Sequence, residues 1–457
     1  MNKFIETLKN IWNIKELRDR ILFTLLILGV YRLGSFIVLP GVDPVGLEAG
    51  TSGGAGQGLL GLINIFTGGA FNKGAVFALG IMPYITASII IQLLGFAVPY
   101  FQRLQQKEGE SGRKKITQIT RMLTVFITLV QGGGYLAYLN SIPGGVSPYV
   151  SPSVFWFGNI IILSTGTIFA MWLGEKITDR GIGNGISLLI MIGIIASLPG
   201  AFVAEVSAQF AKSGPLMLIV EFAVFFLVVV ATILIVQGVR RIPIQFAKRM
   251  VGRSGGDLPM AGARDYIPLK VNAAGVMPII FAQAIMFLPV TLVGFFSEDA
   301  VANSGFLQSL NDWKSIPYNV VFFLLVVIFT YVYTALLVNP QQYSEYLKRQ
   351  NSFIPGIKPG SQTQDYIDTL TTRITLPGSI FLGFISILPA FVAKFGVNDA
   401  FALFFGGTSL LILVGVVLDT LQQIESYLLM RKYDGLVKSG RLKGRSGSGM
   451  QQIGASF

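Results

Sequence analysis

The chain has 457 residues, of which 52% are hydrophobic and only 13% are charged. Soluble domains carry about 25% charged residues, so this composition excludes a string of ordinary soluble domains and predicts a polytopic membrane protein. Neither cysteine nor histidine occurs, which excludes disulfides, thiolate metal sites and an imidazole base. We therefore expect no metal and no cofactor, and the net charge of +12 is informative through its position.

The apolar segments, in chain order, predict ten membrane spans. Residues 1–20 come first and mix apolar and charged side chains at helical spacing, which predicts an amphipathic helix on the cytoplasmic surface. The spans follow at residues 21–39, 75–99, 119–139, 155–173, 183–202, 216–237, 272–296, 317–338, 374–394 and 401–419. The tenth is expected to continue as a helix to Tyr433, and residues 434–457 predict a flexible tail.

The predicted fold is an all-α membrane protein in two halves of five helices, residues 21–205 and 206–433, joined near residues 204–215. Equal halves are typical of membrane transport proteins with a central pathway; an even division of ten spans by chance is the alternative. Ahead of the second span, residues 50–58 predict a flexible external connector. Residues 59–71 are too short to cross, and the adjacent Gly68 and Gly69 weaken helical continuity there.

The basic residues predict the orientation of these spans. Of the 35 Lys and Arg residues, 30 fall on one set of alternating segments, namely residues 1–20, 100–121, 174–180, 238–270, 339–373 and 431–457. The other five are Arg32, Lys73, Lys212, Lys314 and Lys394. Because basic residues concentrate on the cytoplasmic side, both termini are expected in the cytoplasm.

The span centres offer little for ion coupling or for an ATPase. Arg32 and Glu221 lie within predicted spans, and neither has an evident charged partner, whereas ion and proton pathways usually use such residues. Residues 109–115, Gly-Glu-Ser-Gly-Arg-Lys-Lys, lack the spacing of a phosphate-binding loop and predict a basic turn at the membrane surface. We expect no enzyme activity, and any driving energy must come from a partner or from the membrane potential.

Two cytoplasmic loops, residues 238–270 and 339–373, are long enough to bind partners. In the first, Ile242, Ile244 and Phe246 alternate as in a strand, and residues 252–256 supply turn residues for a hairpin. A basic cluster runs through the same loop: Arg240, Arg241, Lys248, Arg249 and Arg253. It could bind ribosomal RNA or an acidic protein face; charge that merely orients the membrane segments is the alternative.

Four sequence blocks resemble the SecY family, the central channel subunits of the bacterial Sec translocon. Residues 77–94, Phe-Ala-Leu-Gly-Ile-Met-Pro-Tyr-Ile-Thr-Ala-Ser-Ile-Ile-Ile-Gln-Leu-Leu, are similar to the second span of that family. Residues 174–187, Gly-Glu-Lys-Ile-Thr-Asp-Arg-Gly-Ile-Gly-Asn-Gly-Ile-Ser, resemble the entry to its fifth. Residues 268–278, Pro-Leu-Lys-Val-Asn-Ala-Ala-Gly-Val-Met-Pro, resemble its seventh, and residues 405–412, Phe-Gly-Gly-Thr-Ser-Leu-Leu-Ile, its tenth. Together such blocks cover roughly residues 17–443.

The resemblance implies a passive, laterally gated channel for unfolded secretory chains in the bacterial cytoplasmic membrane. The apolar ring that it implies at mid-membrane consists of Ile81, Ile85, Ile186, Ile190, Ile280 and Ile412. Within each of the pairs 81/85 and 186/190 the spacing of four places both side chains on one helix face. Isoleucines that pack or face lipid are the alternative.

The resemblance also implies a plug and a lateral gate. The short helix of residues 59–71 would seal the ring from outside, with Phe66, Thr67, Gly68 and Gly69 as its pore-side residues. Gln92 would lie at the gate between spans two and seven, where signal peptides and nascent chains enter and apolar segments leave for the lipid bilayer. A re-entrant piece with a purely structural role is the alternative for residues 59–71.

The implied partners are a ribosome, a SecA-like motor ATPase, and small SecE-like and SecG-like membrane subunits. Docking of the ribosome or motor is assigned to the two cytoplasmic loops, through Arg240, Arg241, Lys248, Arg249 and Lys358. Residues 353–360, Phe-Ile-Pro-Gly-Ile-Lys-Pro-Gly, depart from the family, which generally has Arg where this chain has Lys358. Because Lys lacks the forked geometry of Arg, we expect docking there to differ or to be weaker.

Two other classes of function remain open from the residues alone. A membrane-embedded enzyme would need a buried constellation of Ser, Asp or Glu, and the predicted span centres contain no paired carboxylates. A transporter for small solutes would need a polar site at the midplane. Uptake of a small solute into vesicles would distinguish the transporter from the channel.

Overall fold

The computed structural model describes residues 12–50, 59–106, 109–212, 214–246, 264–296, 309 and 312–438. Several predicted features lie outside these residues. They are most of the surface helix of residues 1–20, the connector of residues 51–58, the turn of residues 252–256, the tail from residue 439, and Lys248, Arg249 and Arg253.

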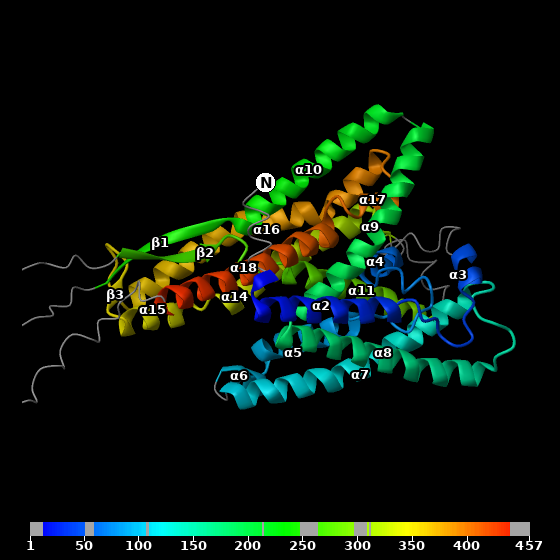
Figure 1. Ribbon diagram of the computed structural model, residues 1–457, viewed down its shortest axis with the longest axis horizontal. Coiled ribbons are helices and arrows are strands. Elements are labelled where there is room, and N and C mark those ends of the chain that lie inside the picture. Colours follow the sequence, from blue (N-terminus) through cyan, green and yellow to red (C-terminus); the bar gives the residue numbers. More distant parts are fainter. Residues whose placement is uncertain are drawn as a thin grey trace, which may run out of the picture.

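Long helices lie side by side in one bundle, and a small sheet extends from one end of it (Figure 1). Up to residue 212 the helices are α2 (Lys15–Gly34), α3 (Pro44–Gly50), α4 (Leu59–Phe66), α5 (Met82–Ala97), α6 (Pro99–Gln106), α7 (Gly109–Ser141), α8 (Pro152–Arg180) and α9 (Gly185–Lys212). After it come α10 (Pro215–Gln237), α11 (Met277–Phe296), α14 (Ile316–Leu337), α15 (Pro340–Arg349), α16 (Ser361–Lys394), α17 (Asp399–Ala402) and α18 (Gly407–Lys438).

Among the described residues, seven helices are long and apolar enough to cross a membrane, namely α7, α8, α9, α10, α14, α16 and α18. Helices α5 and α11 are apolar but shorter, and α2 has charged residues in its first two turns. All three run within the same bundle (Figure 1). The all-α membrane fold is therefore confirmed, and the predicted count of ten spans is consistent with these helices.

Helix α7 shows that the bundle places apolar side chains on its outside. Met122 and Phe126 are exposed, whereas Thr124 and Thr128 are fully buried. Each buried threonine hydroxyl donates to the carbonyl four residues earlier, at 2.7 Å, so both hydroxyls are satisfied within the helix. Such an arrangement is costly in water but is suited to hydrocarbon, where exposed polar groups are the costly ones.

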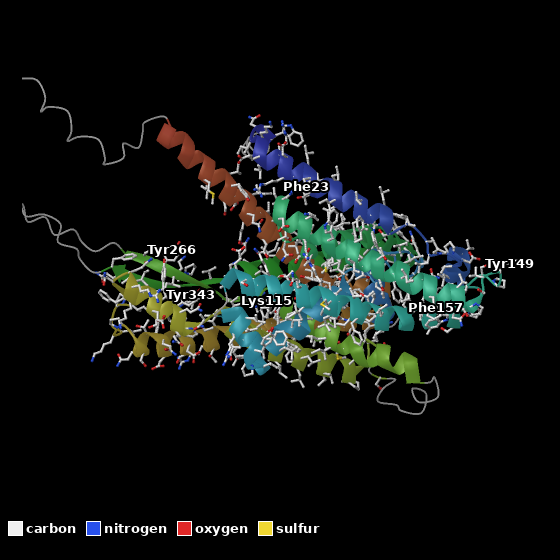
Figure 2. All side chains as sticks on the ribbon, turned by 90° about the horizontal axis from the view of Figure 1, so that it is seen from below. Phe23, Lys115, Tyr149, Phe157, Tyr266 and Tyr343 are labelled. Carbon is white, nitrogen blue, oxygen red and sulfur yellow. The ribbon has the colours of Figure 1, made fainter. Side chains whose placement is uncertain are left out.

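The two ends of the molecule differ in kind. Figure 2 shows Tyr266 and Tyr343 at one end, on the sheet and on α15, and Tyr149 at the opposite end, in the connection between α7 and α8. The sheet end carries the long loops that the basic residues assign to the cytoplasm.

The two long loops that were predicted to be cytoplasmic fold together into one unit, which we call the cytoplasmic unit after that prediction. Strands β1 (Val239–Phe246), β2 (Arg264–Lys270) and β3 (Ser352–Phe353) form an antiparallel sheet in the order β2-β1-β3. The predicted hairpin strands are confirmed. Its small core, which is separate from that of the bundle, consists of Ile242, Ile244, Leu269, Leu347, Ile354 and Ile367. A partner that binds either loop therefore meets both.

Two boundary predictions on the cytoplasmic side were wrong. Residues 109–115 are not a turn but the first turns of α7, where Lys114 pairs with Glu110 at 3.2 Å. Residues 361–373 were expected in a loop but begin α16. Both helices begin outside the apolar segments, and in α7 the pair of Lys114 with Glu110, four residues apart, supports the polar first turns. An apolar segment therefore marks only part of such a helix.

Two boundaries within the bundle also differ from the prediction. The second span was expected from residue 75, but residues 67–81 form turns and α5 begins at Met82. The tenth was expected from residue 401, but α18 begins at Gly407, after the short α17. Positive φ angles at Gly68, Gly80 and Gly407 place the chain in a region that favours glycine, and there it turns.

A close backbone approach between α8 and α9 yields a stability prediction. A Cβ atom at Gly185 would lie 1.9 Å from the carbonyl oxygen of Gly174, so we expect Gly185→Ala to destabilise the protein by about 1–3 kcal/mol. The matched control is Gly158→Ala, because a Cβ atom at Gly158, within α8, meets nothing within 4 Å. Thermal unfolding in detergent measures both. Equal midpoints for the two variants would contradict the prediction.

Candidate functional site

The isoleucines of the predicted ring lie in the apolar core of the bundle. Ile81 and Ile85 lie at the start of α5, Ile186 and Ile190 in the first turns of α9. Ile280 lies in α11 and Ile412 in α18. Five of the six belong to the large buried core and are at most 9% exposed, and the half-buried Ile186 packs against it.

The packing of the helices places the four carriers of these isoleucines in one bundle. Helix α11 contacts both α5 and α18, and α18 contacts α9, so segments more than 300 residues apart in sequence contribute to the same core. The isoleucines are β-branched and stiff about χ1, and their side chains offer no hydrogen-bonding group. A cluster of this kind can exclude water without binding a polar chain.

The short helix α4 is packed against the same cluster. Phe66, its last residue, is buried there, and Thr67 is only 1% exposed. The Thr67 hydroxyl donates to the carbonyl of Ile63 at 3.0 Å and accepts from the amide of Phe71 at 3.3 Å. Gly68 and Gly69, with φ of +64° and +90°, turn the chain away. The predicted break in the second span is confirmed.

Gln92 lies on α5, which contacts both α7 and α11. Its side chain is half-buried and donates to the hydroxyl of Ser88 at 3.1 Å. On α11, Gln283 is buried as well. The structure thus places Gln92 on α5, one of the two helices between which the gate was predicted. Its described hydrogen bond stays within α5, so its place at the gate remains a prediction.

Sequence reasoning missed a buried polar stripe on α7, formed by Thr120, Thr124, Thr128 and Gln131. The spacing of four, four and three residues places them on one helix face. That spacing is readable in the sequence, but the segment was treated only as an apolar span.

Sequence reasoning also missed a carboxylate cluster between α9 and α10. The amide nitrogen of Gln209 donates to Oε1 of Glu205 at 2.8 Å and to Oε1 of Glu221 at 2.6 Å, and the Asn398 amide donates to Oε2 of Glu205 at 2.7 Å. All three side chains of the cluster are buried. Helix α9 ends at Lys212 and α10 begins at Pro215, so the connection between them lies within the predicted junction of residues 204–215. Glu221, for which no charged partner was evident in the sequence, accepts a hydrogen bond from Gln209.

The docking residues that the structure describes lie on the cytoplasmic unit. Arg240 and Arg241 are exposed on β1, and the guanidinium of Arg241 lies 4.9 Å from the centre of the Tyr266 ring. Lys358 is exposed before α16, and its carbonyl accepts from the Thr363 hydroxyl at 2.9 Å. Within the described ranges, no three acidic side chains are grouped as a metal ion requires.

These features define a class of protein, namely a multi-pass helical membrane protein whose buried centre is apolar and is built from four helices that are distant in sequence. The SecY family model matches residues 75–421. Two relatives named protein translocase subunit SecY are similar over nearly their full length. The one from Streptomyces coelicolor is 43% identical, with 93% of this chain and 97% of the relative covered. The one from Chlamydia muridarum is 39% identical, with 96% and 99% covered.

Solved structures share the fold at low identity. One described as a protein-conducting channel has a TM-score of 0.61 at 17% identity and covers 92% of this chain and 94% of its own. A SecY structure concerned with the plug domain gives 0.59 at 19%, covering 92% and 93%. Canine Sec61 in a ribosome–channel complex gives 0.56 at 17%, covering 92% and 94%. The chain therefore belongs to the SecY family and is a protein-conducting channel subunit.

Proposed function

We propose that this chain forms the polypeptide pathway of a Sec-type translocase in the bacterial cytoplasmic membrane, with both termini in the cytoplasm. The observation that supports the proposal is that Phe66 of α4 and five of the six isoleucines, from four helices, lie in one buried apolar core against which Ile186 packs. The ring is the constriction and the segment from α4 to Gly69 is the plug. An apolar ring seals by excluding water and widens around any unfolded chain.

Lateral release follows from the contact of α5 with α11. If these helices separate, a segment in the pore meets lipid. A sufficiently apolar segment then leaves, because its transfer from water to hydrocarbon is favourable. Gln92 and Ser88 form a polar pair on α5 that an entering signal peptide would meet.

The energy source and the docking partners belong to the proposal as well. The channel is passive, and a SecA-like motor or a ribosome drives the chain from the cytoplasmic unit, where Arg240, Arg241 and Lys358 are exposed. Canine Sec61, which shares the fold, forms a ribosome–channel complex. Small SecE-like and SecG-like subunits would complete the assembly. The two halves, divided near residue 205, would move apart on opening.

Site-specific crosslinking tests the pathway. A photoreactive residue replaces Ile85 or Ile190 in the complete translocase in vesicles, and a secretory precursor is halted in transit. We expect adducts at both positions and none at Leu324, an exposed residue on the outer side of α14. Precursor that crosses the membrane without an adduct at either isoleucine would refute the assignment of the ring.

A further inference from the structure

Arg32 lies near the end of α2 and contacts the plug segment. Its guanidinium donates to the carbonyl oxygen of Gly68 at 3.0 Å. It forms no ion pair with a carboxylate of the described residues. An arginine within a membrane helix is costly and needs a partner, and here that partner is a backbone carbonyl of the turn that follows α4.

The position of this guanidinium is fixed by its neighbours. Its central carbon lies 5.3 Å from the centre of the Phe36 ring, and the ammonium of Lys73 lies 4.4 Å from the same ring. A cation over an aromatic face is attracted to it. Two cations therefore share one ring, but of their side chains only that of Arg32 is described as donating a hydrogen bond to the plug segment; Lys73 donates to the Gly69 carbonyl through its backbone amide alone.

The opposite side of the turn fits against a notch in α9. A Cβ atom at Gly193 would lie 2.2 Å from the carbonyl oxygen of Phe66, so only glycine permits the plug backbone to approach α9 this closely. A Cβ atom at Gly68 would lie 2.3 Å from Nη1 of Arg32 and 3.0 Å from Cα of Gly193. The turn is thus held between α2 and α9 with no space for a side chain at either glycine.

The chemistry of the contact favours the seated plug. The last carbonyls of a helix lack partners within it and form the negative end of its dipole, where a cation is favourable. Arg32 meets the carbonyl two residues beyond the end of α4. A hydrogen bond from a charged donor is about twice as strong as one between neutral groups.

We propose that Arg32 is a positioning residue that latches the plug in its seated position through the Gly68 carbonyl, with Gly193 as the notch that receives the turn. The proposal rests on the proposed function of residues 59–69 as the plug. Arg32 of α2 and Gly193 of α9 both precede the predicted division near residue 205, so the latch holds the plug to one half while the ring draws on both. Separation of the halves can then widen the ring before the plug leaves.

The absence of native cysteine makes the position of the plug measurable. A cysteine introduced by Ile65→Cys, at a position that is 7% exposed, reports plug displacement by its reaction with a membrane-impermeant thiol reagent. The complete translocase in vesicles, without precursor, is treated from the external side. We expect Arg32→Gln to speed labelling about tenfold, because a charged hydrogen bond is lost. Arg32→Lys restores part of the effect, because an ammonium can still donate to one carbonyl.

The matched control is Lys73→Gln, which removes a cation from the same Phe36 ring but no hydrogen bond to the plug that is described. It should leave labelling unchanged. Equal labelling of the Arg32→Gln and Lys73→Gln proteins would overturn the latch. If Arg32→Gln does not yield an intact complex, Gly193→Ala decides, since it expels the Phe66 carbonyl. Faster labelling than in the wild type then supports Gly193 as the notch that receives the turn, and labelling at the wild-type rate overturns the proposal.

Precursor translocation by the unmodified complex separates this inference from the proposed function. If the complex translocates precursor but the labelling rate of Ile65→Cys is the same with and without the Arg32 and Gly193 substitutions, the latch alone is refuted. A complex whose ring gives no adduct with a translocating precursor refutes the proposed pathway, whatever the labelling rates are.

Discussion

Replacement of Ile85 and Ile190 together by asparagine is expected to raise the resting ion conductance of the reconstituted channel by about tenfold or more. Both side chains are buried in the ring cluster on two different helices. Asparagine presents hydrogen-bonding groups that stabilise water at the proposed constriction. Each 1.4 kcal/mol by which the free energy of wetting the constriction falls raises the population of the water-filled state about tenfold. Single-channel recording in planar bilayers measures this conductance.

The control for the conductance experiment is the pair Ile85→Leu and Ile190→Leu. It preserves volume and apolar character, and such changes cost less than about 1.5 kcal/mol in a core. We expect this protein to remain closed. A leak of equal size in both double variants would show that loss of packing, rather than polarity, opens the pathway. A closed asparagine variant would contradict the assignment of the ring as the seal.

Substitution of Gln209 by leucine is expected to lower the thermal unfolding midpoint by several degrees. The Gln209 amide is the group that both buried carboxylates, Glu205 and Glu221, accept from. Its removal leaves the Glu221 carboxyl without its described donor, next to the buried Glu205 carboxyl, which keeps the Asn398 N–H; the loss costs about 2–5 kcal/mol. Unfolding of the purified complex in detergent, followed by light scattering or intrinsic fluorescence, gives the midpoint.

The same substitution at an exposed site provides the control. Gln102, on α6, is exposed, so Gln102→Leu should change stability by less than about 0.5 kcal/mol. Addition of Glu221→Gln to Gln209→Leu should recover part of the loss, because it removes one charge and supplies a new amide donor. Equal midpoints for Gln209→Leu and Gln102→Leu would show that the cluster contributes nothing to the fold.

Local features of the fold were readable in the sequence because their causes are local. Gly68 and Gly69 predicted the break in the second span, and the alternation of Ile242 and Ile244 predicted β1. Helix ends were missed on the cytoplasmic side, since hydropathy marks where the hydrocarbon ends, whereas α7 and α16 continue into water. A hydrophobic window carries no information on that continuation.

The contacts that build the site depend on tertiary structure and were largely unreadable. Glu205 meets the backbone of Asn398, 193 positions away, and no local pattern signals that pairing. The ring was predicted through family resemblance and stays a prediction; the structure places five of its members in the large buried core of the bundle and Ile186 against it. The contact between Arg32 and Gly68 was missed because an acidic partner was expected for the arginine. Its acceptor is instead a backbone carbonyl, a group that every residue has.

The cytoplasmic unit joins the bundle without slack. A single residue separates the end of α10 from the start of β1, and six residues separate the end of β2 from the start of α11. The Val271 amide donates to the Gly238 carbonyl at 2.8 Å, where the two strands join these helices. In the docking that we propose, a force on β1 would reach α11 through this short, hydrogen-bonded connection. Binding of a partner to the cytoplasmic unit and movement of α11 would then be mechanically coupled.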